Sequence, residues 1–305
     1  MKEGIEKNIH SEERVLKTLV KWIILSAIVG SIVGVIASGF AYVISWVTEF
    51  RVEHPLMLLG LPVGGILVAF LYKMSGQENN TGTNMVLDTI RTPKAEMPTV
   101  IATLILIATT VTHLFGGSSG REGAALQFGA SVGSAFGRVL NLNESDRKII
   151  MLSGMSAAFA ALFGTPMAAA IFPMEVTSVG IMYYSALVPC VFSAFIGEYV
   201  SVLLKVRTLR VPYLIDEVPS FYSANCLKAI FLAVCFAAAG ALFCIMLHQT
   251  AHLFQKWFPN QYLRVFVGGA SVILLAMLLR TTDYLGLGET ILKDSFVNVQ
   301  SPERF

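Results

Sequence analysis

The stretch Gly120-Arg121-Glu122-Gly123 has the residue types best suited to chemistry in this sequence. It places two ionisable side chains at the expected start of a helix, directly after a run of glycine and serine over residues 116–119. Free backbone N–H groups and the positive end of a helix attract an anion. The carboxylate of Glu122 competes for the same place, and protonation removes its charge. The pattern therefore predicts an anion site gated by a protonatable glutamate.

A structural role is the alternative for this pair of charges, as an internal ion pair within the fold. Neighbouring residues of a helix do not face each other, which makes that role weaker than for residues spaced by four. An ionisable residue at membrane depth is costly and is a functional candidate by default. The functional interpretation is therefore preferred.

Two further loops follow the same logic. Thr81-Gly82-Thr83-Asn84 precedes a short helix, where the Thr83 hydroxyl and free amides can bind an anion or simply cap the helix. Gly164-Thr165-Pro166 opens another helix, with the proline suited to its first turn. These loops supply two more helix starts as candidate parts of one site.

The composition indicates the environment of these loops. The 305 residues are 55% hydrophobic and 14% charged, with a mean hydropathy of +0.68. This apolar excess is too large for one soluble core, and the few Lys and Arg residues speak against a nucleic-acid partner. The chain is therefore expected to be a multi-pass protein of the lipid bilayer, with no cofactor or metal site.

Apolar segments of a length that suits membrane helices recur along the chain. The expected spans or helices cover residues 22–48, 55–74, 97–115, 147–162, 181–204, 224–254 and 265–279. Lysines and an arginine before the first span predict a cytoplasmic N-terminal segment over residues 1–21. Several helices are short and broken by glycine or proline, which is typical of segments that surround a central site. The fold class is therefore all-α with broken helices.

Two of these motifs resemble one known family. The sequence GGSSGREGAALQFG over residues 116–129 resembles the G-[KR]-E-G-x-x-x-Q-x-G signature of CLC chloride channels and anion/proton antiporters. The sequence FGTPMAAAIFPME over residues 163–175 resembles that family's F-N-A-P-L-A-x-x-x-F-x-x-E helix. The resemblance implies an inverted-repeat membrane fold that passes halide anions and protons, in the cytoplasmic (inner) membrane, as a homodimer. Its repeats would be residues 22–204 and 222–305, joined by the loop 205–221.

The resemblance also implies roles for individual residues. Glu122 would be the gating glutamate, which exchanges protons. The anion-binding residues would be Gly82, Thr83, Gly120, Arg121, Gly123, Ala124, Gly164 and Thr165. Ala124 replaces the usual proline, the G-S-G-I-P motif around Thr83 is degenerate, and Val176 occupies the position of the internal proton-relay glutamate, next to Glu175. These departures resemble the bacterial fluoride-exporting branch, so fluoride is expected over chloride.

The second repeat is expected to be incomplete. It reaches the counterpart of the Gly82 region near Tyr284 and Gly288, and the family's G-x-F-x-P motif does not follow. Two alternatives to a transporter therefore stay open. One is a non-conducting fragment or assembly partner, and the other is an intramembrane enzyme that uses Glu122 and His113 as acid and base.

Overall fold

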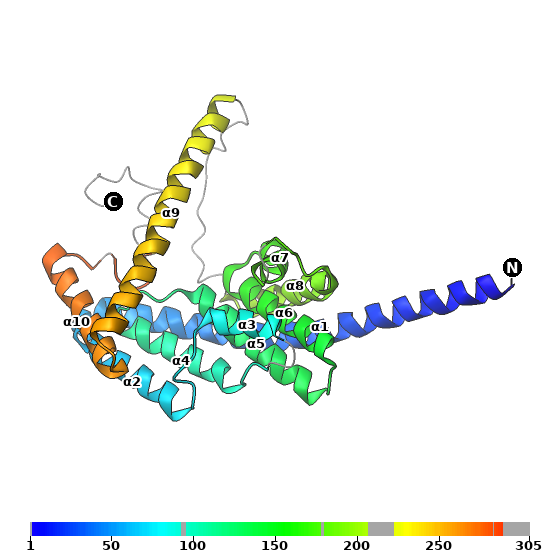
Figure 1. The fold of residues 1–305 in the computed structure, drawn as a ribbon, viewed down its shortest axis with the longest axis horizontal. Helices are drawn as coiled ribbons and strands as arrows, with labels where there is room; N and C mark the ends of the chain where they lie inside the picture. Colours follow the sequence, from blue (N-terminus) through cyan, green and yellow to red (C-terminus); the bar gives the residue numbers. More distant parts are fainter. Residues whose placement is uncertain (1, 93–95, 178–179, 207–222, 283, 289–305) are drawn as a thin grey trace.

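The computed structural model describes residues 2–92, 96–177, 180–206, 223–282 and 284–288, which form helices and no strand (Figure 1). The α-helices are α1 (Lys2–Glu53), α2 (Leu61–Met74), α3 (Thr83–Arg91), α4 (Val100–Leu114), α5 (Arg121–Val139), α6 (Glu144–Phe163), α7 (Pro166–Val176), α8 (Leu187–Leu203), α9 (Ser223–Trp257) and α10 (Gln261–Leu279). Short 3-10 helices, η1 (Pro55–Gly60) and η2 (Tyr184–Ala186), precede α2 and α8. The all-α class predicted from the sequence is confirmed.

Helix α1 is much longer than a bilayer requires. Its 52 residues extend roughly 78 Å at 1.5 Å per residue, against a hydrocarbon core of about 30 Å. Its N-terminal part projects beyond the other helices (Figure 1). The expected boundary at residue 21 therefore coincides with a change from charged to apolar sequence and not with a break in the helix.

Helices α5 and α6 form the centre of the molecule, and most of their side chains are buried. Glycines allow their backbones to touch: a Cβ atom on Gly154 would lie 2.2 Å from the carbonyl oxygen of Gly129. The ring of Phe128 is fully buried and meets Phe40 of α1 edge to face, with the ring centroids 6.1 Å apart. This tight core fixes the helix that carries Glu122.

Helix α1 also packs closely along α8. A Cβ atom on Gly30 would lie 2.8 Å from the carbonyl oxygen of Ser193, and one on Gly34 would lie 3.1 Å from that of Gly197. Small residues spaced by four allow this approach in membrane helices. The glycines of the first predicted span therefore admit a neighbouring helix.

Five of the described segments are long and apolar enough to cross a membrane. They are Glu13–Glu53, Pro55–Met74, Tyr184–Leu203, Asn225–Trp257 and Gln261–Leu279. The predicted span over residues 97–115 is wrong in length, because α4 has only 15 residues and about 20 are needed for a full crossing. Like α3 and α7, it is a short helix.

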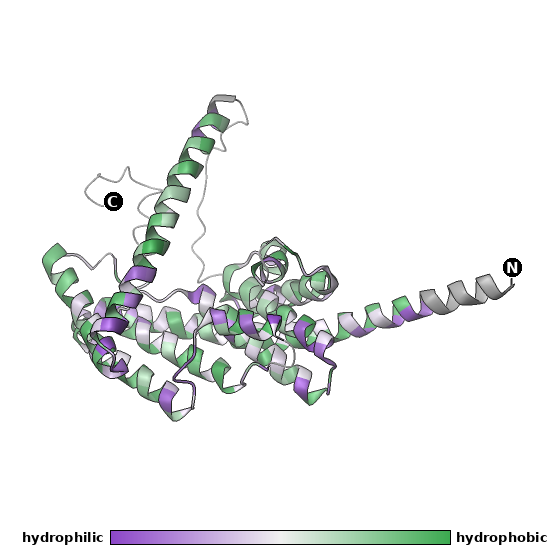
Figure 2. Ribbon diagram, viewed as in Figure 1, coloured by the Kyte–Doolittle hydropathy of each residue, from purple (hydrophilic) through white to green (hydrophobic). Residues whose placement is uncertain are grey.

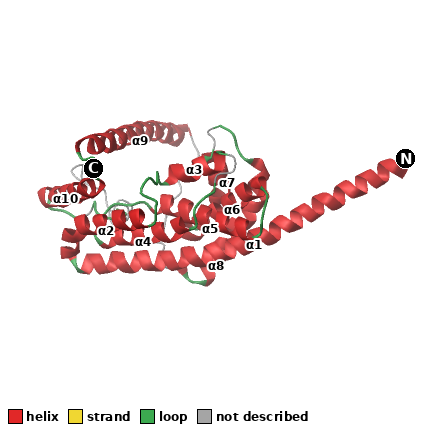
Figure 3. Cartoon of the chain, turned by 60° about the horizontal axis from the view of Figure 1, so that its bottom comes forward, coloured by secondary structure: helices red, strands yellow, loops and turns green. Residues whose placement is uncertain are grey.

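Helices α9 and α10 are the least packed part of the described chain. None of the residues in the apolar window of either helix is buried, although α10 contacts α2. Hydrophobic residues cover α9 along most of its length (Figure 2), and the helix stands apart from the others in a second view (Figure 3). Lipid or further protein must cover such a surface in a membrane.

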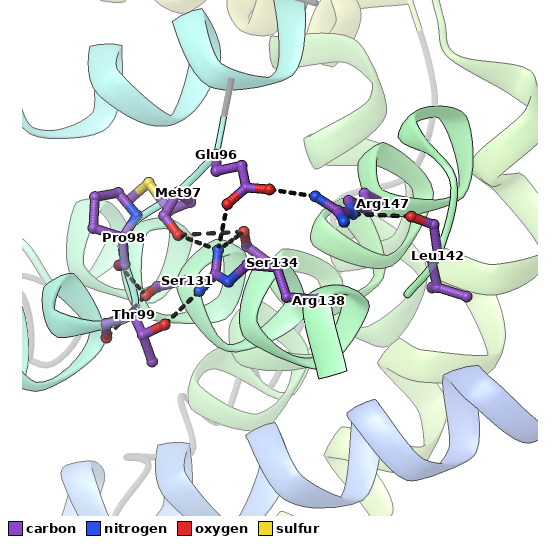
Figure 4. A network of polar contacts seen from close by, with 9 residues as sticks. All are labelled: Glu96, Met97, Pro98, Thr99, Ser131, Ser134, Arg138, Leu142 and Arg147. Carbon is purple, nitrogen blue, oxygen red and sulfur yellow. Dashed lines mark hydrogen bonds and ion pairs between the residues drawn. The ribbon is translucent and has the colours of Figure 1, made fainter. Parts of the chain in front are cut away.

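A polar network ties the segment before α4 to α5 and α6 (Figure 4). Nη1 of Arg138 donates to the carbonyl oxygen of Met97 and to Oγ of Ser134, both at 2.9 Å. The carboxylate of Glu96 pairs with Arg147 at the start of α6 and approaches Nη1 of Arg138 to 3.8 Å. These contacts fix the ends of α5 and α6 that lie away from Glu122.

Candidate anion-binding site

Helix α5 begins where the sequence predicts, directly after the glycine and serine run. Gly120 is its N-cap residue, with an extended backbone, and Glu122 lies in the first turn. A Cβ atom on Gly120 would lie 2.6 Å from Oε2 of Glu122. The carboxylate of this exposed side chain therefore turns back over the start of its own helix. It occupies the place where partial positive charge favours an anion.

A second helix start meets α5 at this point. Gly82, the N-cap residue of α3, has φ +67° and ψ −130°, a conformation that is open to glycine and closed to other residues. Its N–H donates to Oδ1 of Asn80 over 2.6 Å. The turn directs Thr83 toward α5, where its Oγ1 lies 3.2 Å from the position that a Cβ would take on Gly123. The structure thus brings Thr83 and Gly123 together.

Gln127 lies directly beneath this junction and was missed by the sequence reasoning. Its Nε2 donates to the carbonyl oxygen of Gly123 over 3.2 Å and lies 3.9 Å from a Cβ built on Gly82. The side chain is 5% exposed, and its Oε1 has no hydrogen-bond partner among the described residues. The available signal was its spacing of four from Gly123, which places both on one helix face.

Two of the remaining candidate residues, Ala124 and Arg121, lie near the junction of α3 and α5. The other two, Gly164 and Thr165, lie apart from it. Ala124 is buried in the first turn of α5, and Arg121 is half-buried beside Glu122. Gly164 ends α6 with φ +72°, and Thr165 is the N-cap residue of α7. Helix α7 packs against α6 and α8, so the contacts between Thr83 and Gly123 do not involve these two residues. Their role in anion binding stays a prediction.

The loop before Glu122 is braced by the chain that follows α10. The N–H of Gly286 donates to the carbonyl oxygen of Gly116 over 3.2 Å, and Oγ of Ser118 donates to that of Tyr284 over 3.2 Å. Arg51 lies between the two loops, with its side chain 3.3 Å from Cβ positions built on Gly116 and on Gly286. The region expected to mirror the Gly82 loop therefore contacts the loop that precedes Glu122.

Chemically, this junction resembles a receptor for a small anion. Two helix starts, one hydroxyl and a buried amide converge, and a carboxylate is positioned over one of the starts. Unpaired N–H groups at helix starts hold negative charge without a cation. The Glu122 carboxylate is the negative group that lies over the start of α5 in this structure.

Comparisons with known proteins identify the family of this chain. A family model described as "Voltage gated chloride channel" matches residues 64–303. A chloride/fluoride channel protein of Pseudomonas syringae pv. tomato is 32% identical over 293 residues, which are 94% of this chain and 64% of that protein. The H(+)/Cl(-) exchange transporter ClcA of Salmonella arizonae is 23% identical over 274 residues, covering 83% of this chain and 57% of that protein.

Solved structures show the same fold. The crystal structure of a CLC-type fluoride/proton antiporter superposes with a TM-score of 0.85 at 30% identity, over 92% of this chain and 70% of that one. A slow cyanobacterial Cl−/H+ antiporter, 19% identical, matches in fold with a TM-score of 0.70 over 92% of this chain and 68% of that one. This chain thus spans about two thirds of the length of these proteins. It is a multi-pass membrane protein and belongs to the voltage-gated chloride channel family.

Proposed function

We propose that the chain takes part in the transport of halide anions across the cytoplasmic membrane, coupled to protons through Glu122. The observation that carries the proposal is the placement of the Glu122 carboxylate over the start of α5, beside the contact between Thr83 and Gly123. A carboxylate in that position excludes an anion while it is charged and admits one when it is neutral. Protons and anions therefore pass through the same small volume.

Within this proposal the residues have distinct tasks. The amides of Gly120, Arg121, Gly123 and Ala124 face the anion from α5. From α3, Gly82 forms the turn, with its own N–H bonded to Asn80, and Thr83 faces the anion. Gly164 and Thr165 add the start of α7. Fluoride is the proposed preferred anion, supported by the likeness to a chloride/fluoride channel protein and to a fluoride/proton antiporter. The homodimer is proposed from family resemblance, and no enzymatic step is assigned.

Reconstitution of the purified chain in liposomes tests the proposal. Vesicles loaded with fluoride or chloride are followed with ion-selective electrodes, and a pH electrode records proton movement. Wild-type protein is expected to release fluoride faster than chloride while moving protons. Glu122→Gln removes the titratable charge and is expected to abolish proton movement and the pH dependence of efflux. The matched control is Glu13→Gln, which removes an exposed carboxylate paired with Lys17 on α1. Efflux and proton movement that are unchanged in Glu122→Gln contradict the gate.

An assembly partner is the second candidate function. It is supported by the apolar surfaces of α9 and α10, none of whose window residues is buried. In this case the chain supplies part of the anion pathway, and another polypeptide completes it. Absence of efflux from the reconstituted chain alone, together with correct folding by circular dichroism, favours this candidate over the transporter.

A further inference from the structure

A polar pocket lies at the opposite end of α3 from Thr83. Its volume is about 520 Å³, and it opens where the end of α3 meets the start of α6 and the segment after α7. The residues that line it are Ile90, Arg91, Glu144, Ser145, Lys148, Thr177 and Tyr183. Thr83 is the first residue of α3 and Arg91 the last, so the pocket is separate from the anion site.

Two cationic side chains in this pocket, Arg91 and Lys148, have hydrogen-bond donors that can still bind a ligand. Nε of Arg91 donates to the carbonyl oxygen of Thr177, and the two Nη groups have no partner in the described part of the chain. Nζ of Lys148 lies 3.8 Å from the carboxylate of Glu144, which is beyond hydrogen-bond distance. Because only one carboxylate accompanies the two cations among the described lining residues, these residues together carry an excess of positive charge.

Neutral donors complete the lining. The side-chain hydroxyls of Ser145 and Tyr183 have no hydrogen-bond partner among the described residues. Ser145 stands in the first turn of α6, a 20-residue helix whose N-cap Asn143 accepts from the N–H of Asp146. The positive end of this helix adds to the charge of Lys148. An anionic ligand thus meets donors from three separate elements.

The volume of the pocket and its hydrogen-bond donors indicate which class of anion it can bind. A halide ion is far smaller than this volume, whereas ligand pockets of about 300–1,000 Å³ hold groups of molecular size. Arginine and lysine with hydroxyl donors and a helix start form the usual surroundings of a phosphate. Ile90 is the one aliphatic residue among the described lining residues, so the part of the ligand that they contact is polar.

We propose that this pocket binds a phosphate group, carried by a lipid headgroup or by a soluble phosphate. Its position agrees with a membrane surface, since the first residues of α6 also pair with Lys21 of α1 through Asp146 at 2.5 Å and with Glu96 through Arg147. Basic pockets between membrane helices near the cytoplasmic surface are suited to lipid headgroups. The proposal is independent of the transport function, because it concerns binding alone.

The test measures binding with two probes. The purified full chain in detergent is titrated with inorganic phosphate by calorimetry at constant ionic strength. Native mass spectrometry then measures the retention of phosphatidylglycerol against zwitterionic phosphatidylcholine. Binding of inorganic phosphate supports a soluble source, and selective retention of phosphatidylglycerol supports a lipid source. Failure of both probes to bind overturns the proposal.

Variants assign the binding to this pocket. Arg91→Gln and Lys148→Met are each expected to weaken binding roughly tenfold, because each removes a charge-assisted hydrogen bond. Tyr183→Phe removes only a hydroxyl and is expected to weaken binding by a smaller factor while leaving the fold intact. Lys17→Met removes the same charge from an exposed position on α1 and is expected to change nothing. Equal weakening in Lys17→Met and Arg91→Gln means that surface charge alone binds the probe, and it overturns the proposal.

Discussion

Oγ1 of Thr83 lies 3.2 Å from the position that a Cβ atom would take on Gly123, so α3 and α5 meet with little room for a methyl group. We expect Gly123→Ala to displace the Thr83 hydroxyl by a few tenths of an ångström and to weaken halide binding several-fold. Small misplacements of a ligand group in an organised site have effects of this kind. Calorimetric titration with fluoride and chloride measures the change.

A second substitution, at Thr83, distinguishes displacement of the Thr83 hydroxyl in Gly123→Ala from a general loss of structure. Thr83→Ser retains the hydroxyl but lacks the methyl group, so the side chain can rotate away from the added carbon. Gly123→Ala combined with Thr83→Ser is expected to bind halide more tightly than Gly123→Ala alone. A double variant that binds no better would show that the contact with Thr83 is not the cause.

Gly120→Ala tests the position of the gating carboxylate. The added methyl would lie 2.6 Å from Oε2 of Glu122, while the backbone of Gly120, at φ −67° and ψ 142°, accepts alanine without strain. We expect the exposed carboxylate to leave the start of α5, so that halide binding depends less on pH and resembles that of Glu122→Gln. Binding isotherms at several pH values measure this. A pH dependence equal to that of the wild type would be evidence against the gate.

The contact between α5 and α6 has a measurable effect on stability. Gly154→Ala places a methyl group 2.2 Å from the carbonyl oxygen of Gly129, where backbone meets backbone and nothing can rotate away. Overpacking of this kind costs about 1–3 kcal/mol. Gly39→Ala is the matched control, because a Cβ there has no neighbouring atom within 4 Å. Thermal unfolding in detergent should show a lower Tm for Gly154→Ala and an equal or higher Tm for Gly39→Ala.

The network around Arg138 predicts that removing the charge of Glu96 and removing the charge of Arg138 lower the stability of the fold by different amounts. Glu96 is 47% exposed at the side chain, so Glu96→Gln should cost less than about 1 kcal/mol and less still at high salt. Arg138→Met leaves Oγ of Ser134 without its donor and leaves the carbonyl oxygen of Met97 with only the Ser134 hydroxyl, at 3.2 Å, and should cost about 1–3 kcal/mol. Unfolding at low and high ionic strength distinguishes the two. Equal costs would contradict this division.

The helix starts at the site were predictable from the sequence, because they depend on residues that are neighbours in the chain. Glycine before Arg121 and proline at position 166 mark helix starts wherever the rest of the chain lies. The likeness to the family signature then gave the expected fold. The length of α4 was not predictable, since residues 97–99 lie outside the helix and Met97 is buried against the C-terminal end of α5.

Contacts between distant segments were beyond the sequence reasoning. Residue spacing does not indicate that Thr83 reaches Gly123. It also does not indicate that Gln127 lies beneath the starts of α3 and α5, with its Oε1 lacking a hydrogen-bond partner among the described residues. The pocket between Arg91 and Lys148 likewise depends on where α3 ends relative to α6. Each of these features arises from the packing of helices whose order in space a single sequence does not give.

The brace between Ser118 and Tyr284 has a consequence for biogenesis. These residues are separated by 166 positions, so at about 5–20 residues per second the ribosome adds Tyr284 on the order of ten seconds or more after Ser118. The loop before Glu122 therefore enters the membrane without this support and gains it only when synthesis reaches the segment after α10. Until then, the part of the chain already made is an intermediate that lacks this contact.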